Sequence, residues 1–266
     1  MDQLKIELSP LPLFLVYFLV DSDAILQIEK IKKLGANFLP EPDSKKTPLR
    51  FRNKFYYNTL LKTWDSSDKL SHLKVEVHEN LLATLDFIKN LDGYYIEIGV
   101  YKGGSAYSAL TFLKETNQVR ETLFIDTFNG FDYEESRKSF DSEWFGTHKI
   151  DENAEFVMDQ VKNSLGAINY PFRLQRGNIC DKELIKTLPN KVAFLNIDVD
   201  QYEATKSSLE YGYEVVVPKG VILLEGTAST PRLYGAAYAL QEFLNSVKGS
   251  KFRHLSLSTH DLLIRN

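Results

Sequence analysis

Two aspartates separated by one residue follow an apolar run in the segment Phe194-Leu-Asn-Ile-Asp-Val-Asp-Gln-Tyr-Glu-Ala-Thr205. Carboxylates this close repel each other unless a cation lies between them or one of them takes up a proton. Divalent-metal binding and general-base catalysis both use such a pair. Asp198 and Asp200 are therefore candidate catalytic residues, and because alternate residues of an extended strand share a face, both should point at one reacting centre. The alternative is a structural pair that caps a helix beginning near Tyr202.

A second candidate lies in Tyr94-Tyr-Ile-Glu-Ile-Gly-Val-Tyr-Lys-Gly-Gly-Ser105, which predicts a strand, a glycine-rich turn and a helix. A dinucleotide site needs the spacing G-x-G-x-x-G, and here Tyr101 occupies the position of the second glycine. Glu97 stands at the end of the strand, where a carboxylate repels phosphate and suits an ammonium or sulfonium ligand. S-adenosylmethionine carries both of these cations and no phosphate. The alternative is a tight strand-to-helix turn in which Glu97 is only solvated.

A third candidate is Asp126 in Leu123-Phe-Ile-Asp-Thr-Phe-Asn-Gly130, at the end of the next predicted strand. In a doubly wound sheet, an acid at the tip of the second strand is placed to accept both ribose hydroxyls. The alternative is a loop aspartate that caps the following turn. Together with Glu97, in this order and spacing, Asp126 favours a nucleoside-binding methyltransferase sheet.

The elements that would position these residues are short apolar runs that alternate with amphipathic stretches. The expected strands span residues 94–98, 122–126, 172–176, 192–198, 220–224, 252–255 and 262–265, and the expected helices 105–115, 152–165, 182–188, 202–213 and 235–247. Strands that alternate with helices predict an α/β fold with a doubly wound, mostly parallel seven-stranded sheet, covered on both faces. The last two strands have no helix between them, which predicts a C-terminal antiparallel hairpin.

Two further regions differ from this alternation. Residues 1–90 are expected to form a mainly helical N-terminal extension, with helices at 24–34, 53–64 and 75–89 and a Pro-rich loop at 39–48, that serves as a lid, an acceptor-pocket wall or an oligomer contact. Residues 91–266 would then form the cofactor-binding domain. The polar segment Phe131–Asn153 follows a strand's carboxyl end, where a long loop would lie over the ligand crevice.

Composition narrows the choice of partner and compartment. Lys and Arg total 32 and Asp and Glu total 36, so the net charge of −4 disfavours nucleic-acid binding. The single cysteine, Cys180, excludes an intrachain disulfide and fits a reducing cytoplasm. The apolar run Leu11–Val20 is too short to span a bilayer, and no cleavage site follows it, so we expect a buried element or an oligomer contact and no stable membrane insertion. The alternative is a shallow membrane contact.

The chain resembles the S-adenosylmethionine-dependent macrocin O-methyltransferases, which methylate sugar hydroxyls on macrolides and related compounds. The resemblance covers roughly Gly93–Phe243 and rests on Glu97-Ile-Gly-Val-Tyr-Lys-Gly-Gly, Asp126-Thr-Phe-Asn-Gly, Ile197-Asp-Val-Asp-Gln-Tyr-Glu-Ala-Thr and Gly235-Ala-Ala-Tyr-Ala-Leu-Gln-Glu-Phe243. The third stretch is the most specific, because it is similar to the family signature Asp-Gly-Asp-x-Tyr-Glu-Ser-Thr.

This resemblance implies a class I methyltransferase fold and a sugar-like small-molecule acceptor of natural-product or surface-polysaccharide type. Asp198 would be a magnesium ligand, and Asp200 would take the proton from the acceptor hydroxyl. The residues implied to bind S-adenosylmethionine are Glu97, Gly99, Gly103, Gly104, Ser105, Asp126, Thr127, Phe128, Asn178 and Asp198.

One departure from the family bears on the metal. After the fifth strand the family has two adjacent aspartates that complete the metal site, whereas this chain has Leu224-Glu225-Gly226. Glu225 could still reach a metal, but Gly226 cannot, and Val199 stands where the family commonly has glycine. The expected metal ligands are therefore Asp198 and Glu225, and dependence on magnesium is left open.

The chemistry leaves alternatives for the base and for the function. An ordinary aspartate has a pKa of about 3.9, far below that of a sugar hydroxyl, so either a metal polarises the oxygen or proton transfer accompanies attack. His148 and His260 are further base candidates, although a histidine at such a position is more often a surface or structural residue. The rival functions are another nucleotide-dependent enzyme on the same sheet, or a catalytically silent cofactor-binding domain, which Gly226 would favour.

Overall fold

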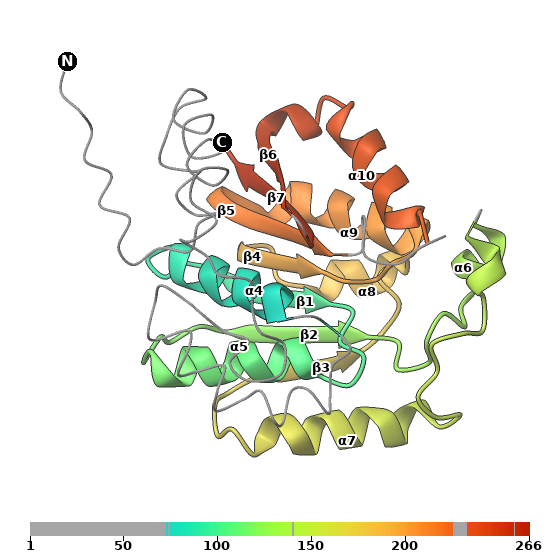
Figure 1. Cartoon of the computed structure of the whole chain (residues 1–266), viewed down its shortest axis with the longest axis horizontal. Coiled ribbons are helices and arrows are strands. Elements are labelled where there is room, and N and C mark those ends of the chain that lie inside the picture. The colour runs from blue at the N-terminus through green and yellow to red at the C-terminus, as the bar shows by residue number, and fades with distance from the viewer. Residues whose placement is uncertain (1–72, 74, 140, 226–232, 258) are drawn as a thin grey trace, which may run out of the picture.

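The computed structural model describes residues 73, 75–139, 141–225, 233–257 and 259–266. Their elements, shown in Figure 1, are α4 (Val75–Phe87), β1 (Tyr94–Ile98), α5 (Gly104–Glu115), β2 (Thr122–Asp126), α6 (Glu134–Lys138), η1 (Ser142–Trp144), α7 (Ala154–Gly166), β3 (Arg173–Arg176), α8 (Lys182–Thr187), β4 (Val192–Ile197), α9 (Tyr202–Val215), β5 (Val216–Glu225), α10 (Gly235–Leu244), η2 (Gly249–Lys251), β6 (Phe252–Ser256) and β7 (His260–Arg265). The predicted helices at 24–34 and 53–64, the loop at 39–48 and the apolar run Leu11–Val20 lie outside the described residues.

The seven strands form one sheet in the order β3-β2-β1-β4-β5-β7-β6. The first five strands pair in parallel, β7 pairs antiparallel to β5, and β6 pairs antiparallel to β7. This arrangement confirms the doubly wound, mostly parallel seven-stranded sheet and its C-terminal hairpin. The chain order reverses between β1 and β4, which is where ligands bind in open α/β sheets.

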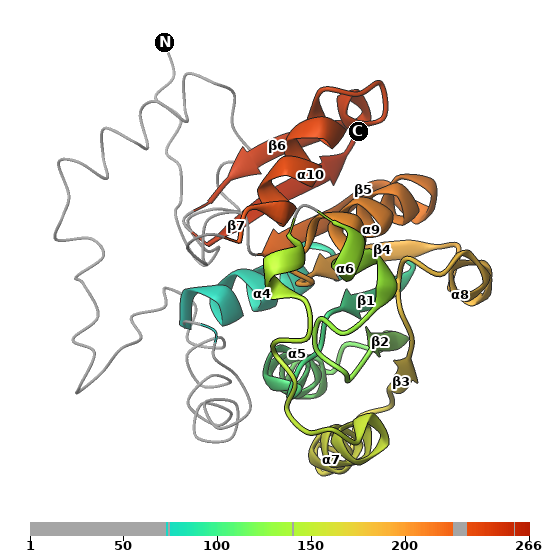
Figure 2. The same cartoon turned by 90° about the vertical axis from the view of Figure 1, so that its right-hand side faces the viewer.

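Neighbouring residues of the strands pack into different cores. Tyr95 and Phe194 cluster with α4, α5 and α7 on one face of the sheet, whereas Ile96 and Leu195 cluster with α9 and α10 on the other. Figure 2 shows α5 and α7 on one side of the strands and α8 on the opposite side. Because both faces are covered, the central strands β1 and β4 are apolar except for the buried residues Glu97 and Asn196, which explains why they are recognisable in the sequence.

The main boundary error concerns β5, which was expected to begin at Gly220. The strand instead begins at Val216, which pairs with Val192, and the pairing resumes after an irregularity in the register. A positive φ of 66° at Lys219 accommodates this bulge. The expected strand therefore lacked the first four residues of β5, which precede or form this bulge.

The segment between α4 and β1 is held by a buried arginine. The Arg120 guanidinium donates hydrogen bonds to the carbonyl oxygens of Gly93 (2.6 Å), Ile88 (2.9 Å) and Leu91 (3.0 Å). Burial lowers the pKa of Arg120, but the charge is kept because it stabilises these carbonyls. This contact fixes α4 against the sheet.

In the part of the chain that the structure describes, no helix is long and apolar enough to cross a membrane.

Candidate functional site

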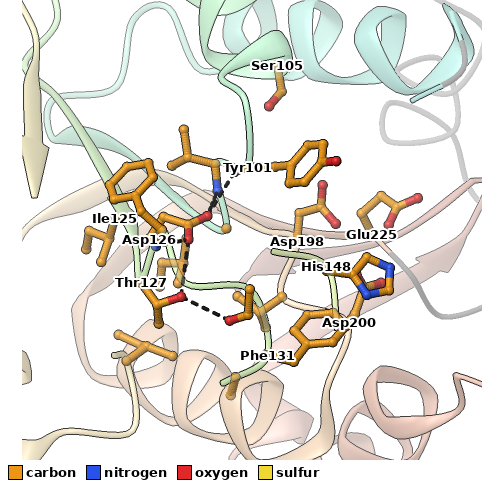
Figure 3. A pocket seen from close by; sticks show the side chains of 18 of the residues that line it. Tyr101, Ser105, Ile125, Asp126, Thr127, Phe131, His148, Asp198, Asp200 and Glu225 are labelled. Carbon is orange, nitrogen blue, oxygen red and sulfur yellow. Dashed lines mark hydrogen bonds between the residues drawn. The ribbon is translucent and has the colours of Figure 1, made fainter. Parts of the chain in front are cut away.

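A cavity of about 430 Å³ lies at the carboxyl ends of β1, β2, β4 and β5. A volume of this size is within the range of small-molecule sites. Its lining includes the turn after β1, Asp126 after β2, Asp198 and Asp200 after β4, and Glu225 at the end of β5. Figure 3 shows Asp126 and Thr127 on one side of the pocket and the carboxylates of Asp198, Asp200 and Glu225 on the other. The topology thus brings together candidates that are far apart in the sequence.

The turn after β1 requires glycine at two positions for different reasons. Gly99 has a φ of +91°, and a Cβ there would stand 1.8 Å from the carbonyl oxygen of Asp198. Gly103 has a φ of +87° and precedes α5, where a Cβ would press on Val161 at 3.1 Å. Gly99 lines the cavity and Gly103 does not. The first glycine lets β1 and β4 approach at the site, while the second packs the helix.

Asp126 organises this turn through its carboxylate. Oδ2 accepts hydrogen bonds from the backbone N–H groups of Val100 (2.6 Å) and Tyr101 (2.8 Å), and Oδ1 accepts one from Phe128 (2.7 Å). The loop-capping alternative is therefore observed. The Thr127 hydroxyl makes a fourth, long contact with Oδ1 at 3.5 Å. Because a carboxylate has about four lone-pair sites, a ligand in the cavity that Asp126 lines would have to replace this weakest contact.

Glu97 lies beneath the cavity and is not among its lining residues. Its buried carboxylate accepts hydrogen bonds of 2.5 Å from the hydroxyls of Tyr95 and Ser105. Burial raises the pKa of Glu97 to about 7, against the opposing effect of hydrogen bonds from Ser105, Tyr95 and Asn196. The solvated Glu97 that the sequence left open is excluded. Glu97 can act on a ligand through Ser105, which does line the cavity, and its charge also contributes to the raised pKa of Asp198.

The remaining residues implied to bind cofactor are mostly at the cavity wall. Gly104 and Ser105, at the start of α5, both line it, as do Thr127 and Phe128. Asn178 also lines it, but its side chain is engaged, donating to Glu135 Oε2 at 2.8 Å and accepting from the backbone N–H of Cys180 at 3.0 Å.

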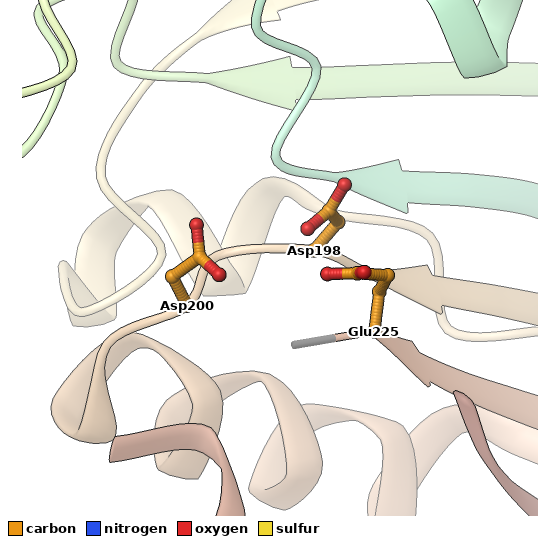
Figure 4. Close-up of side chains that lie close together, drawn as sticks. All are labelled: Asp198, Asp200 and Glu225. Atoms are coloured by element: carbon orange, nitrogen blue, oxygen red, sulfur yellow. The ribbon is translucent and has the colours of Figure 1, made fainter. Parts of the chain in front are cut away.

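Three carboxylates converge on the β4–β5 side of the cavity. One oxygen from each of Asp198, Asp200 and Glu225 lies within 4.8 Å of the others, and Figure 4 shows them around a common space. Oxygens on opposite sides of a bound Mg²⁺ are ~4.2 Å apart, and around Ca²⁺ ~5 Å. The set therefore fits a divalent cation after small side-chain movements. Asp200, predicted only as a base, joins the predicted ligands Asp198 and Glu225.

The geometric reason given for pairing the aspartates was wrong, although the pair does converge. Strand β4 ends at Ile197, and Asp200 has a φ of +61° inside a tight turn closed by a 2.6 Å hydrogen bond from Gln201 N–H to the Val199 carbonyl. A non-glycine residue at positive φ is strained, as is common at functional sites. The turn, and not an extended strand, aims Asp200 into the cavity.

The electrostatics of this cluster favour protonation. Burial, then Glu225 and then Asp200 raise the pKa of Asp198 well above its usual value. Burial, followed by Glu225 and Asp141, raises the pKa of Asp200 to about 7. Asp200 is thus not an ordinary aspartate, and either a proton or a cation must balance the cluster.

Neither aspartate caps the following helix. The backbone N–H of Tyr202 donates to Asp141 Oδ2 at 2.6 Å, so the cap is supplied by the inserted segment. The helix-capping alternative for Asp198 and Asp200 is therefore not observed, which leaves both carboxylates to the cavity.

The segment Phe131–Asn153 lies at the cavity as expected and adds lining residues that the sequence did not single out, Phe131, Tyr133 and Ile150. Of the two spare bases, His148 lines the cavity, whereas His260 is buried outside the lining and accepts from Asn80 Nδ2 at 3.2 Å on Nδ1. Burial lowers the pKa of His260 to about 3. Aromatic residues after a strand end were the available signal for the segment. No sequence signal marked two other lining residues, Leu73, which precedes α4, and Val77, which lies in α4.

Comparison with known proteins agrees with this geometry. Among solved structures, the O-methyltransferase NovP superposes with a TM-score of 0.60 at 18% identity, covering 74% of this chain and 82% of that one. The apo TDP-rhamnose 3'-O-methyltransferase CalS11 of calicheamicin biosynthesis gives 0.53 at 14% identity, covering 92% and 95%. The SAH-bound methyltransferase PaMTH1 of Podospora anserina gives 0.51 at 16% identity, covering 89% and 95%. At these identities the likeness concerns the fold.

Among curated proteins, no sequence matched this chain significantly. The sequence does match the macrocin-O-methyltransferase (TylF) family over residues 68–248, which is more than half of the chain. This match decides against another nucleotide-dependent enzyme on the same sheet. The chain therefore belongs to the macrocin-O-methyltransferase (TylF) family and is an S-adenosylmethionine-dependent O-methyltransferase.

Proposed function

We propose that this enzyme methylates a hydroxyl of a sugar, either free or attached to a small molecule. The observation that carries the proposal is the convergence of Asp198, Asp200 and Glu225 within 4.8 Å, in the same cavity as the turn after β1 and Asp126. Two further facts support a sugar acceptor: the family is described by macrocin O-methylation, and the structurally similar CalS11 is a TDP-rhamnose 3'-O-methyltransferase.

The cofactor is assigned to the side of the cavity with Asp126. S-adenosylmethionine supplies a sulfonium methyl group, which the acceptor oxygen displaces in line to leave S-adenosylhomocysteine. Asp126 would accept the ribose hydroxyls, and the N-terminus of α5 at Gly104 and Ser105 would receive the carboxylate of the methionyl group. Glu97 would act from below by holding the Ser105 hydroxyl, which it contacts at 2.5 Å.

The carboxylate cluster is assigned to the acceptor. Asp200 would take the proton as the acceptor oxygen bonds to the methyl carbon, because it is in the acceptor-side cluster and its turn aims it into the cavity. Asp198 and Glu225 would hold a divalent cation, which would polarise the acceptor oxygen. The donor set fits such an ion, and Gly226 leaves it with one carboxylate fewer than the family pattern.

The partner and compartment belong to the same proposal. A small-molecule acceptor, a cytoplasmic location and the absence of nucleic-acid binding are supported by the cavity, by the single cysteine and by the net charge of −4. A homo-oligomer is compatible with this function, and residues 1–90 are proposed as the extension that completes the acceptor pocket or an oligomer contact.

The test is turnover with S-adenosylmethionine and a panel of free, nucleotide-linked and natural-product-linked sugars. The expected result is a product heavier by one methylene, with one S-adenosylhomocysteine formed per product. Asp126→Ala should weaken S-adenosylhomocysteine binding about 5- to 150-fold, which corresponds to the loss of charge-assisted bonds. Methylation of catechols or proteins with no sugar methylated would overturn the acceptor class, and cofactor binding without any turnover would support a silent domain.

A further inference from the structure

Three aromatic rings gather on the segment that follows β2. The ring centroids of Phe131 and His148 are 4.5 Å apart with planes inclined by 37°, and Trp144 lies 5.8 Å from His148. Phe131 is buried, whereas His148 is exposed, and both line the cavity. Figure 3 labels both, together with Asp200, among the side chains that line the pocket. The imidazole thus lies against aromatic neighbours and is exposed at the cavity wall.

The backbone holds this arrangement in place. Phe131 N–H donates to the Thr147 carbonyl at 3.0 Å, and Gly146 N–H donates to the Phe131 carbonyl at 3.2 Å, so the segment closes on itself. His148 has a φ of +60°, and its Nδ1 lies 2.9 Å from the Thr147 hydroxyl. Positive φ at a non-glycine residue is costly, so the contacts on both sides of His148 impose its position.

The geometry of methyl transfer indicates which part of the cavity the acceptor occupies relative to these rings. In-line displacement places the acceptor oxygen on the side of the transferred methyl group opposite the sulfur, at the carboxylate cluster if the nucleoside binds at Asp126. The rest of the acceptor must then occupy the remaining part of the cavity, whose wall includes Phe131 and His148 as well as Asp200. One face of a pyranose ring carries axial C–H groups, and these are attracted to the negative face of an aromatic ring.

The charged residues of the cavity lining further restrict the chemical class of the acceptor. The cavity lining of the described residues carries the carboxylates of Asp126, Asp198, Asp200 and Glu225 and neither a lysine nor an arginine. A phosphate at this position would therefore meet only negative charge, apart from any bound cation and His148. A neutral ring avoids this cost.

We propose that His148, held by Phe131 and Trp144, is the stacking wall of an acceptor subsite that takes the apolar face of a neutral pyranose ring. The inference deepens the proposed sugar O-methylation and rests on it for the direction in which the acceptor lies. It assigns His148 to binding and specificity and leaves proton transfer to Asp200.

The first test compares three variants in steady-state methylation of the sugar acceptor. His148→Ala should raise the acceptor KM by about 10-fold with a much smaller change in kcat, because a stacking contact is lost. His148→Phe keeps a ring and should recover most of the lost affinity. Phe145→Ala removes an aromatic ring of the same segment that lies outside the cavity lining, and it is the control for general disturbance. Each variant should bind S-adenosylhomocysteine like the wild type.

Two kinetic outcomes would overturn the subsite. If His148→Phe were as impaired as His148→Ala and the loss fell on kcat, the imidazole would be acting as a proton acceptor. If His148→Ala had an unchanged acceptor KM, the ring would not contact the acceptor.

The second test does not require turnover. Saturation-transfer NMR with methyl β-D-glucopyranoside, the galactoside and methyl α-L-rhamnopyranoside, in the presence of S-adenosylhomocysteine, should show transfer concentrated on the C–H groups of one ring face. The effect should fall at least twofold in His148→Ala and persist in Phe145→Ala. Face-selective transfer without methylation of any sugar would refute the proposed function and retain the subsite. If a sugar were methylated but the saturation transfer did not depend on His148, the subsite would be refuted and the proposed function retained.

Discussion

The buried carboxylate of Asp141 accepts a hydrogen bond from the backbone N–H of Tyr202, with 2.6 Å between Oδ2 and N. Asp141 belongs to the segment that lines the acceptor side of the cavity, and Tyr202 begins α9, immediately after the turn that carries Asp200. Gly235 makes room for this contact, since a Cβ there would stand 2.0 Å from Oδ2. The acceptor segment and the Asp200 turn are therefore joined through one side chain.

Loss of this contact should impair transfer without affecting the cofactor. Asp141→Ala removes the only side-chain cap observed at the start of α9 in the described chain and should cost about 0.5–2 kcal/mol of stability. We expect the methylation rate to fall by about 10- to 100-fold through misplacement of Asp200. S-adenosylhomocysteine binding should not change. Asp141→Asn retains an acceptor oxygen and should recover most of the rate; normal turnover in Asp141→Ala would contradict the coupling.

Gly99 should tolerate no side chain. In Gly99→Ala the Cβ would meet the carbonyl oxygen of Asp198 at 1.8 Å, and a φ of +91° adds strain, so we expect a loss of about 2–5 kcal/mol in the free energy of unfolding. Gly166→Ala is the matched control, because a Cβ at that helical position meets no atom within 4 Å. Denaturant unfolding of the two variants measures the difference. Equal stability would show that β1 and β4 can separate at the site.

Glu97 should make stability depend on pH. Burial raises its pKa from 4.5 to about 7, so the folded state favours the protonated acid. The resulting stability is fully present below pH 4.5 and is lost as pH rises through 7, with a total of about 3 kcal/mol. Glu97→Gln should remove this dependence. Its free energy of unfolding, measured at several pH values and subtracted from that of the wild type, isolates Glu97 from the other raised groups, such as Glu79. A flat difference curve would refute the assignment.

The carboxylate cluster should bind a divalent cation. EDTA is expected to lower methylation and Mg²⁺ to restore it, and Mg²⁺ alone should raise the Tm of the cofactor-free protein because it binds only the folded state. In Glu225→Gln, the Mg²⁺ concentration needed to produce the same rise in Tm should be at least 10-fold higher. Glu183→Gln, which removes an exposed carboxylate of α8, serves as the control. Full activity in EDTA together with an unchanged Tm would leave the proton as the species that balances the cluster.

Asp200→Asn should separate proton transfer from binding. The amide keeps the size of the side chain and loses its basicity, so single-turnover methylation should slow by about 100-fold or more. Titration with S-adenosylhomocysteine should be nearly unaffected. Asp198→Asn should instead weaken cation binding as well as the rate. Near-normal turnover in Asp200→Asn would move the base elsewhere, and His148 would be the next residue to test.

The sheet was predictable because its signals are local. A central strand such as β4 is apolar except for Asn196, and a parallel sheet buries both of its faces. The position of Asp126 and Asp198 at strand ends then followed from topology, since the ends of parallel strands meet at one edge. Glu97 could have been predicted to bond Tyr95, because residues two apart on a strand share a face.

The rest depended on backbone conformations and long-range contacts that no local pattern encodes. The +61° φ of Asp200 is set by the packing of the turn and cannot be inferred from an aspartate's own preferences. The contact between Asp141 and Tyr202 joins residues 61 positions apart. Neither the length nor the composition of the segment after β2 says that His148 faces the cavity.

The bonds of Arg120 bear on how this family can diverge. Its partners in the loop between α4 and β1 are carbonyl oxygens, which every amino acid provides. Apart from Gly93, where a φ of +139° and a Cβ 2.7 Å from the Ala193 nitrogen exclude a side chain, the loop can therefore change in sequence while its path stays the same. Arg120→Lys would lose the forked geometry that reaches several carbonyls at once. In evolutionary terms, Arg120 constrains the backbone path of the loop more than its sequence, because it contacts carbonyl oxygens and not side chains.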